Sequence, residues 1–344
     1  MRRAFVAIVV AGILAWLTWR LQTPYAGFGA AQLVDIPHGV STPVMAGLLE
    51  QRGVIRSSWE FLALRVIHPR ARLQAGEYRF EGPAPSSRVF ERIARGDVHH
   101  YEFTAPEGSN LFDIARIVAR LGFVSESEFR EAALDPSLVR DLSPQARTLE
   151  GYLFPSTYRV TRYTTAAQIC RLMTTEFRAV WKQLASSGNV HHAVTLASLI
   201  EKETSRPEER PLVASVFSNR LTLGMNLDCD PTTIYAALLE NRYRGVIHKS
   251  DLESKHPYNT YRHAGLPPGP ISSPGRESLQ AALAPAHTSY LFFVARPGAG
   301  ASHQFSVTRA DHERAVAQYR RGIKRTIQAS PARPVPGRTK PARG

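Results

Sequence analysis

The stretch His192-Ala193-Val194-Thr195-Leu196-Ala197-Ser198-Leu199-Ile200-Glu201-Lys202-Glu203-Thr204 is apolar almost throughout and carries two glutamates near its end. As a helix with about 100° per residue, it places Glu201 on one face with Val194, Ala197 and Ser198. Burial among apolar neighbours disfavours a charged carboxylate, so Glu201 can serve as an acid. A purely structural role for Glu201 is the alternative. Glu203 lies on the opposite side, so periodicity predicts a supporting role for it.

Residues 1–22 combine two leading arginines with an apolar stretch that stays uncharged until Arg20. About 18 residues at 1.5 Å each give roughly 27 Å, enough to span a bilayer. The arginines favour a cytoplasmic N-terminus, and Trp16 and Trp19 suit the far interface. A cleaved signal peptide is the alternative, because small residues follow at 26–31. We expect an uncleaved membrane anchor over residues 1–22, with the rest of the chain exported.

The chain carries a net charge of +14 over 344 residues, but this charge is unevenly distributed. Eight positive and no negative charges lie from Arg320 onward, which leaves +6 for the rest. Such a Pro-rich basic tail is typical of a solvated, disordered extension, and nucleic-acid binding is not expected. Cys170 and Cys229 are the two cysteines and are expected to be buried free thiols, although pairing stays open. The adjacent histidine doublets lack metal-ligand spacing, so no metal or cofactor is expected.

Two segments after the anchor share one order of features: a strand, a Pro-x-Gly turn, a helix, a glycine stop and a second, Ser-capped helix. The turn and stop glycines have the same spacing, Gly39 to Gly53 and Gly108 to Gly122. Residues 73–80 predict a strand that closes the first segment. The expected class is α+β, with small α/β units preceding a mixed α+β domain. The expected divisions are an anchor at 1–22, a first unit at 30–100, a repeat-like unit or connector at 101–146, a main domain at 147–322 and a tail at 323–344.

Motifs with unusual polar clusters follow one another through the second half of the chain. They are Glu150-Gly151-Tyr152-Leu153-Phe154-Pro155, the Ala197–Thr204 segment, Val216-Phe217-Ser218-Asn219-Arg220-Leu221, Asp230-Pro231-Thr232-Thr233-Ile234-Tyr235, Tyr258-Asn259-Thr260-Tyr261 and Gly265-Leu266-Pro267-Pro268-Gly269-Pro270-Ile271. In this order they resemble the endolytic murein transglycosylase family, membrane-anchored enzymes that cut peptidoglycan glycan strands. The resemblance covers the anchor, a LysM-like N-terminal unit and the region from about Leu149 to Tyr319.

The resemblance implies Glu201 as the catalytic acid and base, because it matches the Glu-Lys-Glu-Thr motif of the family. It implies substrate-binding roles for residues in the matching motifs, each with a structural role as its alternative: Asn219, Asp230, Tyr235, Asn259 and Tyr261. Two departures from the family pattern occur, at Asp228-Cys229 and around His303. They put a sugar contact and the role of His303 in doubt.

As the resemblance implies, the reaction cleaves MurNAc–GlcNAc bonds of nascent strands and leaves 1,6-anhydro-MurNAc ends, which terminates strand elongation. A water-using muramidase is one alternative, with Asp230, Glu203 or Glu150 as base or nucleophile. A non-catalytic peptidoglycan-binding scaffold is another. The expected location is the inner membrane, single-pass, with the catalytic domain in the periplasm. The expected partners are glycan strands, the membrane and peptidoglycan synthases.

Overall fold

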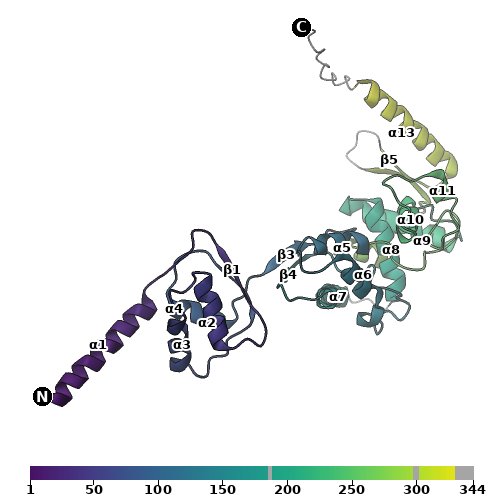
Figure 1. Cartoon of the computed structure of the whole chain (residues 1–344). Helices are drawn as coiled ribbons and strands as arrows, with labels where there is room; N and C mark the ends of the chain where they lie inside the picture. Colours follow the sequence, from purple (N-terminus) through teal and green to yellow (C-terminus); the bar gives the residue numbers. More distant parts are fainter. Residues whose placement is uncertain (185–187, 297–301, 330–344) are drawn as a thin grey trace, which may run out of the picture. The chain divides into compact units, whose positions relative to one another are not determined.

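The computed structural model describes residues 1–184, 188–296 and 302–329, which divide into two compact units (Figure 1). The N-terminal unit comprises residues 1–103, 121–123 and 158–165. The C-terminal unit comprises residues 104–120 and 124–157 together with the chain from 166 onward. The predicted α+β class is confirmed, because helices alternate with small two-stranded sheets. The division at 104 differs from the expected separate unit at 101–146, most of which belongs to the C-terminal unit.

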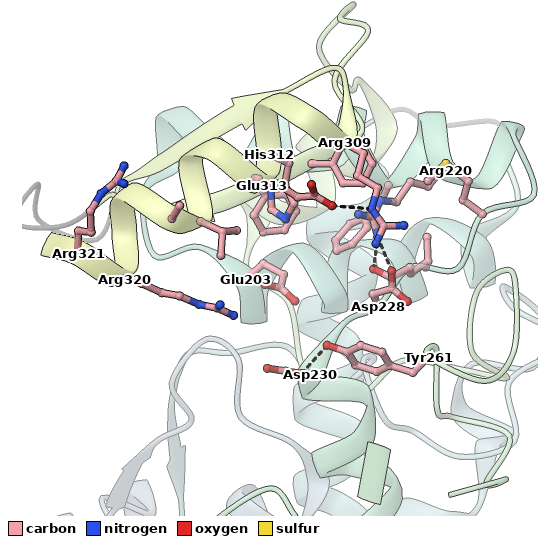
Figure 2. A pocket seen from close by; sticks show the side chains of 17 residues that line it. Glu203, Arg220, Asp228, Asp230, Tyr261, Arg309, His312, Glu313, Arg320 and Arg321 are labelled. Atoms are coloured by element: carbon pink, nitrogen blue, oxygen red, sulfur yellow. Dashed lines mark hydrogen bonds and ion pairs between the residues drawn. The ribbon is translucent and has the colours of Figure 1, made fainter. Parts of the chain in front are cut away.

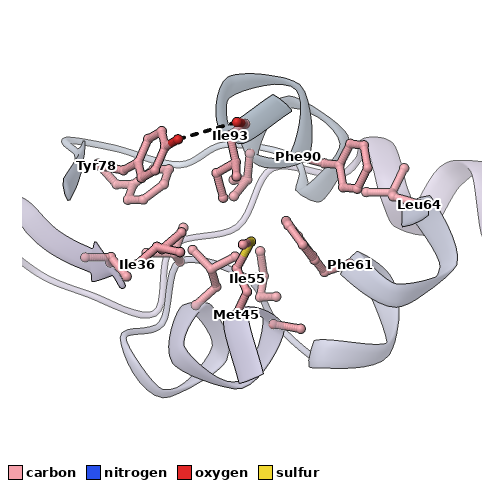
Figure 3. Packing of buried hydrophobic residues seen from close by; sticks show 14 of the residues in the cluster. Ile36, Met45, Ile55, Phe61, Leu64, Tyr78, Phe90 and Ile93 are labelled. Carbon is pink, nitrogen blue, oxygen red and sulfur yellow. Dashed lines mark hydrogen bonds between the residues drawn. The ribbon is translucent and has the colours of Figure 1, made fainter. Parts of the chain in front are cut away.

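The N-terminal unit has the order helix, strand, helix, helix, strand, helix. Its elements are α1 (Arg2–Gln22), β1 (Gln32–Ile36), α2 (Thr42–Gln51), α3 (Ser58–Ile67), β2 (Gly76–Phe80) and α4 (Ser86–Arg95). β1 pairs antiparallel with β2, with Val34 opposite Tyr78. Alternating residues of both strands point to the helices and build a core with Ile36, Phe61 and Phe90 (Figure 3).

The end of α1 is part of this core. Leu21 is buried, and Arg20 Nε lies 2.8 Å from Glu60 Oε1 on α3. The Trp16 and Trp59 rings stack with centroids 5.9 Å apart. Along the rest of α1 the apolar side chains are exposed, and α1 is the one helix among the described residues long and apolar enough to span a membrane.

The predicted repeat is confirmed in element order. The second copy consists of β3 (Tyr101–Thr104), α5 (Leu111–Ala119), α6 (Glu126–Leu134), the short helix η1 (Pro136–Leu138) and β4 (Thr157–Val160), with β3 paired to β4. The turn glycines Gly39 and Gly108 have φ of 80° and 74°, and the stop glycines Gly53 and Gly122 have 66° and 82°. These left-handed values suit glycine and explain why the same spacing recurs.

The C-terminal unit continues with helices arranged around α8 (Val190–Glu203). The other elements are α7 (Ala166–Gln183), η2 (Pro207–Glu209), α9 (Arg210–Thr222), α10 (Asp230–Leu239), α11 (Lys249–Leu252), α12 (Arg276–Leu283), β5 (Phe292–Ala295), β6 (His303–Ser306) and α13 (Arg309–Ala329). β5 and β6 form an antiparallel hairpin. Both cysteines are buried free thiols, as expected. Helix α13 continues to Ala329, so the expected tail boundary at 323 falls inside a helix; residues 330–344 lie outside the described residues.

The Pro/Gly-rich loop before α12 is fixed against α8. Ile271 N donates to Ser198 Oγ at 3.1 Å, and Ser272 Oγ donates to Ser198 O at 3.1 Å. Gly151 lies where this loop passes closely, with a φ of 81°, and a Cβ there would lie 2.4 Å from Pro270 Cβ. Glycine is therefore required at 151, both for the left-handed backbone and for space.

Candidate functional site

The last turn of α8 separates the two glutamates of the sequence motif, as periodicity predicted. Asn189 caps the start of α8 by accepting from His192 N, and the helix ends at Thr204 in an extended conformation. Along α8 the side chains from Ala193 to Ile200 are buried, so its two faces both pack against other elements. Glu201 and Glu203 therefore enter two different environments.

Glu201 belongs to an ionic cluster around Arg210, the first residue of α9. Arg210 Nη2 lies 3.2 Å from Glu201 Oε1, and both side chains are only 6% exposed. Gly275 N, at the start of α12, donates to Glu201 Oε2 at 2.9 Å. Arg210 also contacts Glu107 and Glu277, at 3.5 and 2.6 Å. We call Glu107, Glu201, Arg210 and Glu277 the Arg210 cluster.

The Arg210 cluster holds three carboxylates around one guanidinium, so it has more acidic than basic groups. This excess affects the pKa of Glu107. Burial and the neighbouring Glu201 charge raise the pKa of Glu107, against the attraction of Arg210. Glu201 therefore has a charged partner and a backbone donor in place of the apolar surroundings that periodicity predicted. Its contacts join the ends of α8, α9 and α12.

Glu203 lines a cavity of about 1000 Å³, which we call the Glu203 cavity; Glu201 does not line it. Figure 2 shows Glu203 facing the space between α13 and the Asp230–Tyr261 pair. The lining also includes polar, charged and aromatic side chains from α9, α10, β5, α13 and the loops before α10 and after α11: Arg220, Asp228, Asp230, Tyr261, Phe292, Arg309, His312, Arg320 and Arg321. A mixed polar and aromatic lining of this size suits an extended sugar ligand.

The Glu203 carboxyl is set up to hold a proton. Burial raises the pKa of Glu203, and the charge of Asp230 raises it further, whereas a hydrogen bond from Cys229 lowers it. That bond runs from Cys229 Sγ to Glu203 Oε1 at 2.9 Å. A carboxyl with these properties, facing a cavity, is the kind expected of a general acid.

Two of the predicted substrate-binding residues share the cavity with Glu203. Tyr261 Oη donates to Asp230 Oδ1 at 2.7 Å, and Asp230 is the first residue of α10 (Figure 2). Beside them Asp228 adopts a left-handed φ of 50° and accepts from Arg220 Nη1 at 3.2 Å. The departure at 228 therefore places an additional carboxylate at the cavity rim, where Arg220 compensates its charge.

The structure puts the other three predicted residues elsewhere. Asn219 Nδ2 donates to the carbonyls of Thr288 and Tyr290, at 2.8 and 2.9 Å, and so holds the approach to β5. Asn259 is fully buried and donates to the carbonyls of residues 251, 252 and 254. Tyr235 is buried, its Oη donates to Glu150 Oε2, and its ring centroid lies 6.3 Å from that of Phe112 on α5. Of these three residues, none lines the Glu203 cavity, although Tyr235 lines a second cavity; their substrate-binding roles stay predictions.

Sequence reasoning missed the contribution of α13 to the cavity. Arg309 and His312 line it from the first turns of this helix, and Arg320 and Arg321 line it farther along. Burial lowers the pKa of His312. The sequence predicts a solvated tail from Arg320 onward, because charge runs usually are solvated. The helical spacing of His312, Ala315, Val316 and Tyr319, which are less exposed than the residues between them, is the signal that this helix packs.

Glu150 and His303 occupy polar sites of their own outside the cavity lining. Glu150 is 1% exposed, and its Oε2 accepts from Leu111 N and Tyr235 Oη, each at 2.9 Å. Its Oε1 has no hydrogen-bond partner among the described residues, and burial raises the pKa of Glu150 to about 7. His303 Nδ1 lies 2.7 Å from Glu209 Oε2 and fastens β6 to η2. In the described part of the chain, no group of three or more His, Cys, Asp or Glu is placed to hold a metal ion.

Comparison with known proteins follows the same ordered motifs. The YceG-like family model matches residues 34–318, which is most of the chain. The chain belongs to the YceG-like family. The endolytic murein transglycosylase of Bacillus subtilis (strain 168) is 31% identical over 307 residues, covering 83% of this chain and 84% of the relative.

Two further relatives support this membership. An endolytic murein transglycosylase of Streptococcus pneumoniae serotype 2 is 28% identical, covering 83% of this chain, which spans 58% of that longer protein. The crystal structure of a YceG-like protein from Listeria monocytogenes has a TM-score of 0.54 and 30% identity, covering 83% of this chain and 98% of the other.

Proposed function

We propose that this chain is an endolytic murein transglycosylase, a lyase that cuts MurNAc–GlcNAc bonds in peptidoglycan and leaves 1,6-anhydro-MurNAc ends. The observation that carries the proposal is Glu203, a half-buried carboxyl of raised pKa facing a cavity of about 1000 Å³. The names of the relatives from Bacillus subtilis and Streptococcus pneumoniae support the same reaction class.

One carboxyl suffices for this chemistry. Protonated Glu203 gives its proton to the bridging oxygen as the bond to the anomeric carbon breaks and an oxocarbenium-like centre develops. The resulting carboxylate takes the proton from the C6 hydroxyl of the same muramic acid. That oxygen then closes on the anomeric carbon, without water. Because the nucleophile is already tethered to the ring, much of the ordering entropy is lost before the reaction.

The geometry favours Glu203 over Glu201 as this acid and base. Glu201 is engaged by Arg210 and Gly275 N, whereas Glu203 lines the cavity together with Asp230 and Tyr261. The assignment of Glu201 from the motif stays a prediction. Single variants of Glu201 and Glu203 distinguish between the two residues as the catalytic acid. Asp230 and Tyr261 are proposed to contact the sugar, with Tyr261 offering a ring for stacking and Asp230 a carboxylate for a hydroxyl.

Mass spectrometry of digested glycan strands tests the reaction. The expected products end in 1,6-anhydro-MurNAc, two hydrogens and one oxygen lighter than a reducing end. Reducing ends alone would favour the water-using muramidase, for which Asp230 is the second carboxylate in the same cavity. Binding to purified sacculi without any cleavage by the wild-type chain would favour the non-catalytic scaffold.

We further propose that the N-terminal unit is LysM-like and contributes affinity for glycan. Its strand–helix–helix–strand order over residues 32–80, with the two strands paired antiparallel, supports this assignment. Sedimentation of the Glu203→Gln chain with purified sacculi measures this affinity apart from cleavage. Loss of sedimentation would argue against a glycan-binding unit.

We propose that α1 is an uncleaved anchor in the inner membrane, with the remainder in the periplasm. Cleavage near residues 26–31 would remove Leu21 from the core and Arg20 from Glu60. Such an anchor keeps the site near nascent strands and the synthases that extend them, which are the proposed partners. Carbonate extraction of membranes tests it, because an anchored chain stays with the membrane and keeps its first residues.

A further inference from the structure

A second cavity has a volume of about 610 Å³. Two of its lining residues directly neighbour, in sequence, residues that line the Glu203 cavity. On α8, Glu203 lines the first cavity and Lys202 the second. On α10, Asp230 lines the first and Pro231 the second. The two cavities therefore border the same parts of α8 and α10, and we call the second one the Arg130 pocket.

Two basic side chains in the Arg130 pocket, Arg130 and Lys202, are available to bind a ligand. Arg116 forms an ion pair with Asp113 at the pocket wall. Arg130 is exposed, and its guanidinium carbon lies 4.9 Å from the centroid of the Phe112 ring. Among the described residues, neither Arg130 nor Lys202 has a carboxylate within ion-pair distance, although Glu126 also lines the pocket. A guanidinium over an aromatic face keeps N–H donors that can bind a carboxylate.

Lys202 is held in a position that suits the same role. Its Nζ donates to Gly108 O at 3.1 Å, which fixes one of three donor directions and leaves two. The other lining residues are largely apolar or aromatic: Phe112, Pro231, Ile234, Tyr235, Leu238, Tyr243 and Ile271. The pocket thus combines an apolar wall with two cations, which matches a short peptide that has small apolar side chains and free carboxylates.

We propose that the Arg130 pocket binds the acidic peptide stem of the muramic acid next to the cleaved bond. Arg130 and Lys202 take its carboxylates, and the apolar wall takes its methyl side chains. This inference rests on the proposed function, because a peptide-bearing sugar beside Glu203 is a substrate of that reaction. It gives the chain a means to distinguish strands with peptide stems from bare glycan.

The test compares two probes by calorimetry on the full-length wild-type chain. One is the GlcNAc–MurNAc disaccharide that carries a tetrapeptide, and the other is the same disaccharide without peptide. Neither contains a MurNAc–GlcNAc bond, so neither is consumed. We expect the peptide-bearing probe to bind about tenfold tighter, the contribution typical of one or two charge-assisted hydrogen bonds.

Arg130→Gln should abolish this preference, because the amide keeps the side chain but not its charge. Arg130→Lys should retain part of it. Arg171→Gln changes an exposed arginine on α7, outside the pocket lining, and should retain all of it. Equal affinity of the two wild-type probes, failure of both to bind, or an unchanged preference in Arg130→Gln would overturn the proposal. Absence of anhydro ends from digested strands would overturn the proposed reaction separately, since binding is measured without cleavage.

Discussion

The Arg210 cluster and the Glu203 cavity lie on opposite sides of one helical turn and treat their carboxylates in opposite ways. Glu201 has a guanidinium at 3.2 Å and a backbone donor at 2.9 Å, so its charge is compensated within the protein. Glu203 has a thiol donor and a nearby aspartate, and burial raises its pKa. Two identical side chains, two residues apart, thus differ in chemistry because their partners come from distant segments.

The largest expected effect separates the two glutamates by activity. Glu203→Gln should reduce glycan cleavage by roughly 10²–10⁴-fold, the usual contribution of a general acid, and the melting temperature should show the fold intact. Glu201→Gln should change cleavage per folded molecule by less than about tenfold, within an ordinary positioning effect. Cleavage rates on purified strands measure both. A Glu203→Gln chain that cleaves normally, beside an inactive but folded Glu201→Gln chain, would return the catalytic assignment to Glu201.

The next effect concerns stability and the Arg210 cluster. Arg210→Met removes the cation shared by three carboxylates and should lower the free energy of unfolding by about 3–5 kcal/mol, as when a buried ion pair loses one partner. Chemical denaturation measures this loss. Glu277→Gln removes a carboxylate at the exposed edge of the same cluster and should cost less than about 1 kcal/mol. Equal losses in the two variants would mean that the cluster does not act as a buried unit.

Glu150 extends the comparison to a carboxyl with no charged partner. Its pKa of about 7 in the folded chain lies above the ordinary value of 4.5, so folding favours its protonated form. The associated stability is full below pH 4.5 and is lost as pH rises through 7. Relative to Glu150→Gln, the wild-type chain should therefore lose up to roughly 3 kcal/mol of unfolding free energy between pH 4.5 and 8. Denaturation of both chains across this range checks the difference, and parallel pH profiles would contradict it.

The smallest expected effect is a change in the pKa of Glu203. The hydrogen bond from Cys229 lowers the pKa of Glu203, so Cys229→Ala should raise it. Since cleavage starts from the protonated acid, the alkaline limb of kcat/KM should move to higher pH by less than about one unit. Cys229→Ser keeps a donor and should move the limb less. A shift to lower pH in the alanine variant would show that the bond does not act on the carboxylate.

The sequence was sufficient for features that depend on local order. The repeat was predictable because its turn and stop glycines lie in left-handed backbone conformations, which glycine adopts more readily than other residues. These glycines are Gly39, Gly53, Gly108 and Gly122. The helix predicted from His192 to Thr204 corresponds to α8. Of the Ser caps predicted in the two segments, the one at Ser125 is present as a capping box with Glu128, whereas Ser57 makes no side-chain cap bond. Helical periodicity also placed the two glutamates on opposite faces.

What periodicity could not provide was the identity of the partner on each face. Arg210 approaches Glu201 from the next helix, and the cavity beside Glu203 is completed by α13, more than 100 residues away in sequence. Motif membership likewise could not show that Asp230 lines the cavity whereas Asn259 does not. The Asn259 amide instead donates to backbone carbonyls. Both distinctions depend on tertiary packing, which sequence spacing does not encode.

The burial of Leu21 at the end of α1 limits how far the N-terminal unit can lie from the membrane. Of the 21 residues of α1, the last turn and the Trp16 ring contact the N-terminal core, so the part before them is the part that can lie in lipid. With its last turn fixed in the N-terminal core, an inserted α1 leaves no flexible stalk between lipid and protein. The N-terminal unit would then rest at the membrane surface, and any glycan bound by it, as proposed above, would lie within one small domain's height of the lipid headgroups.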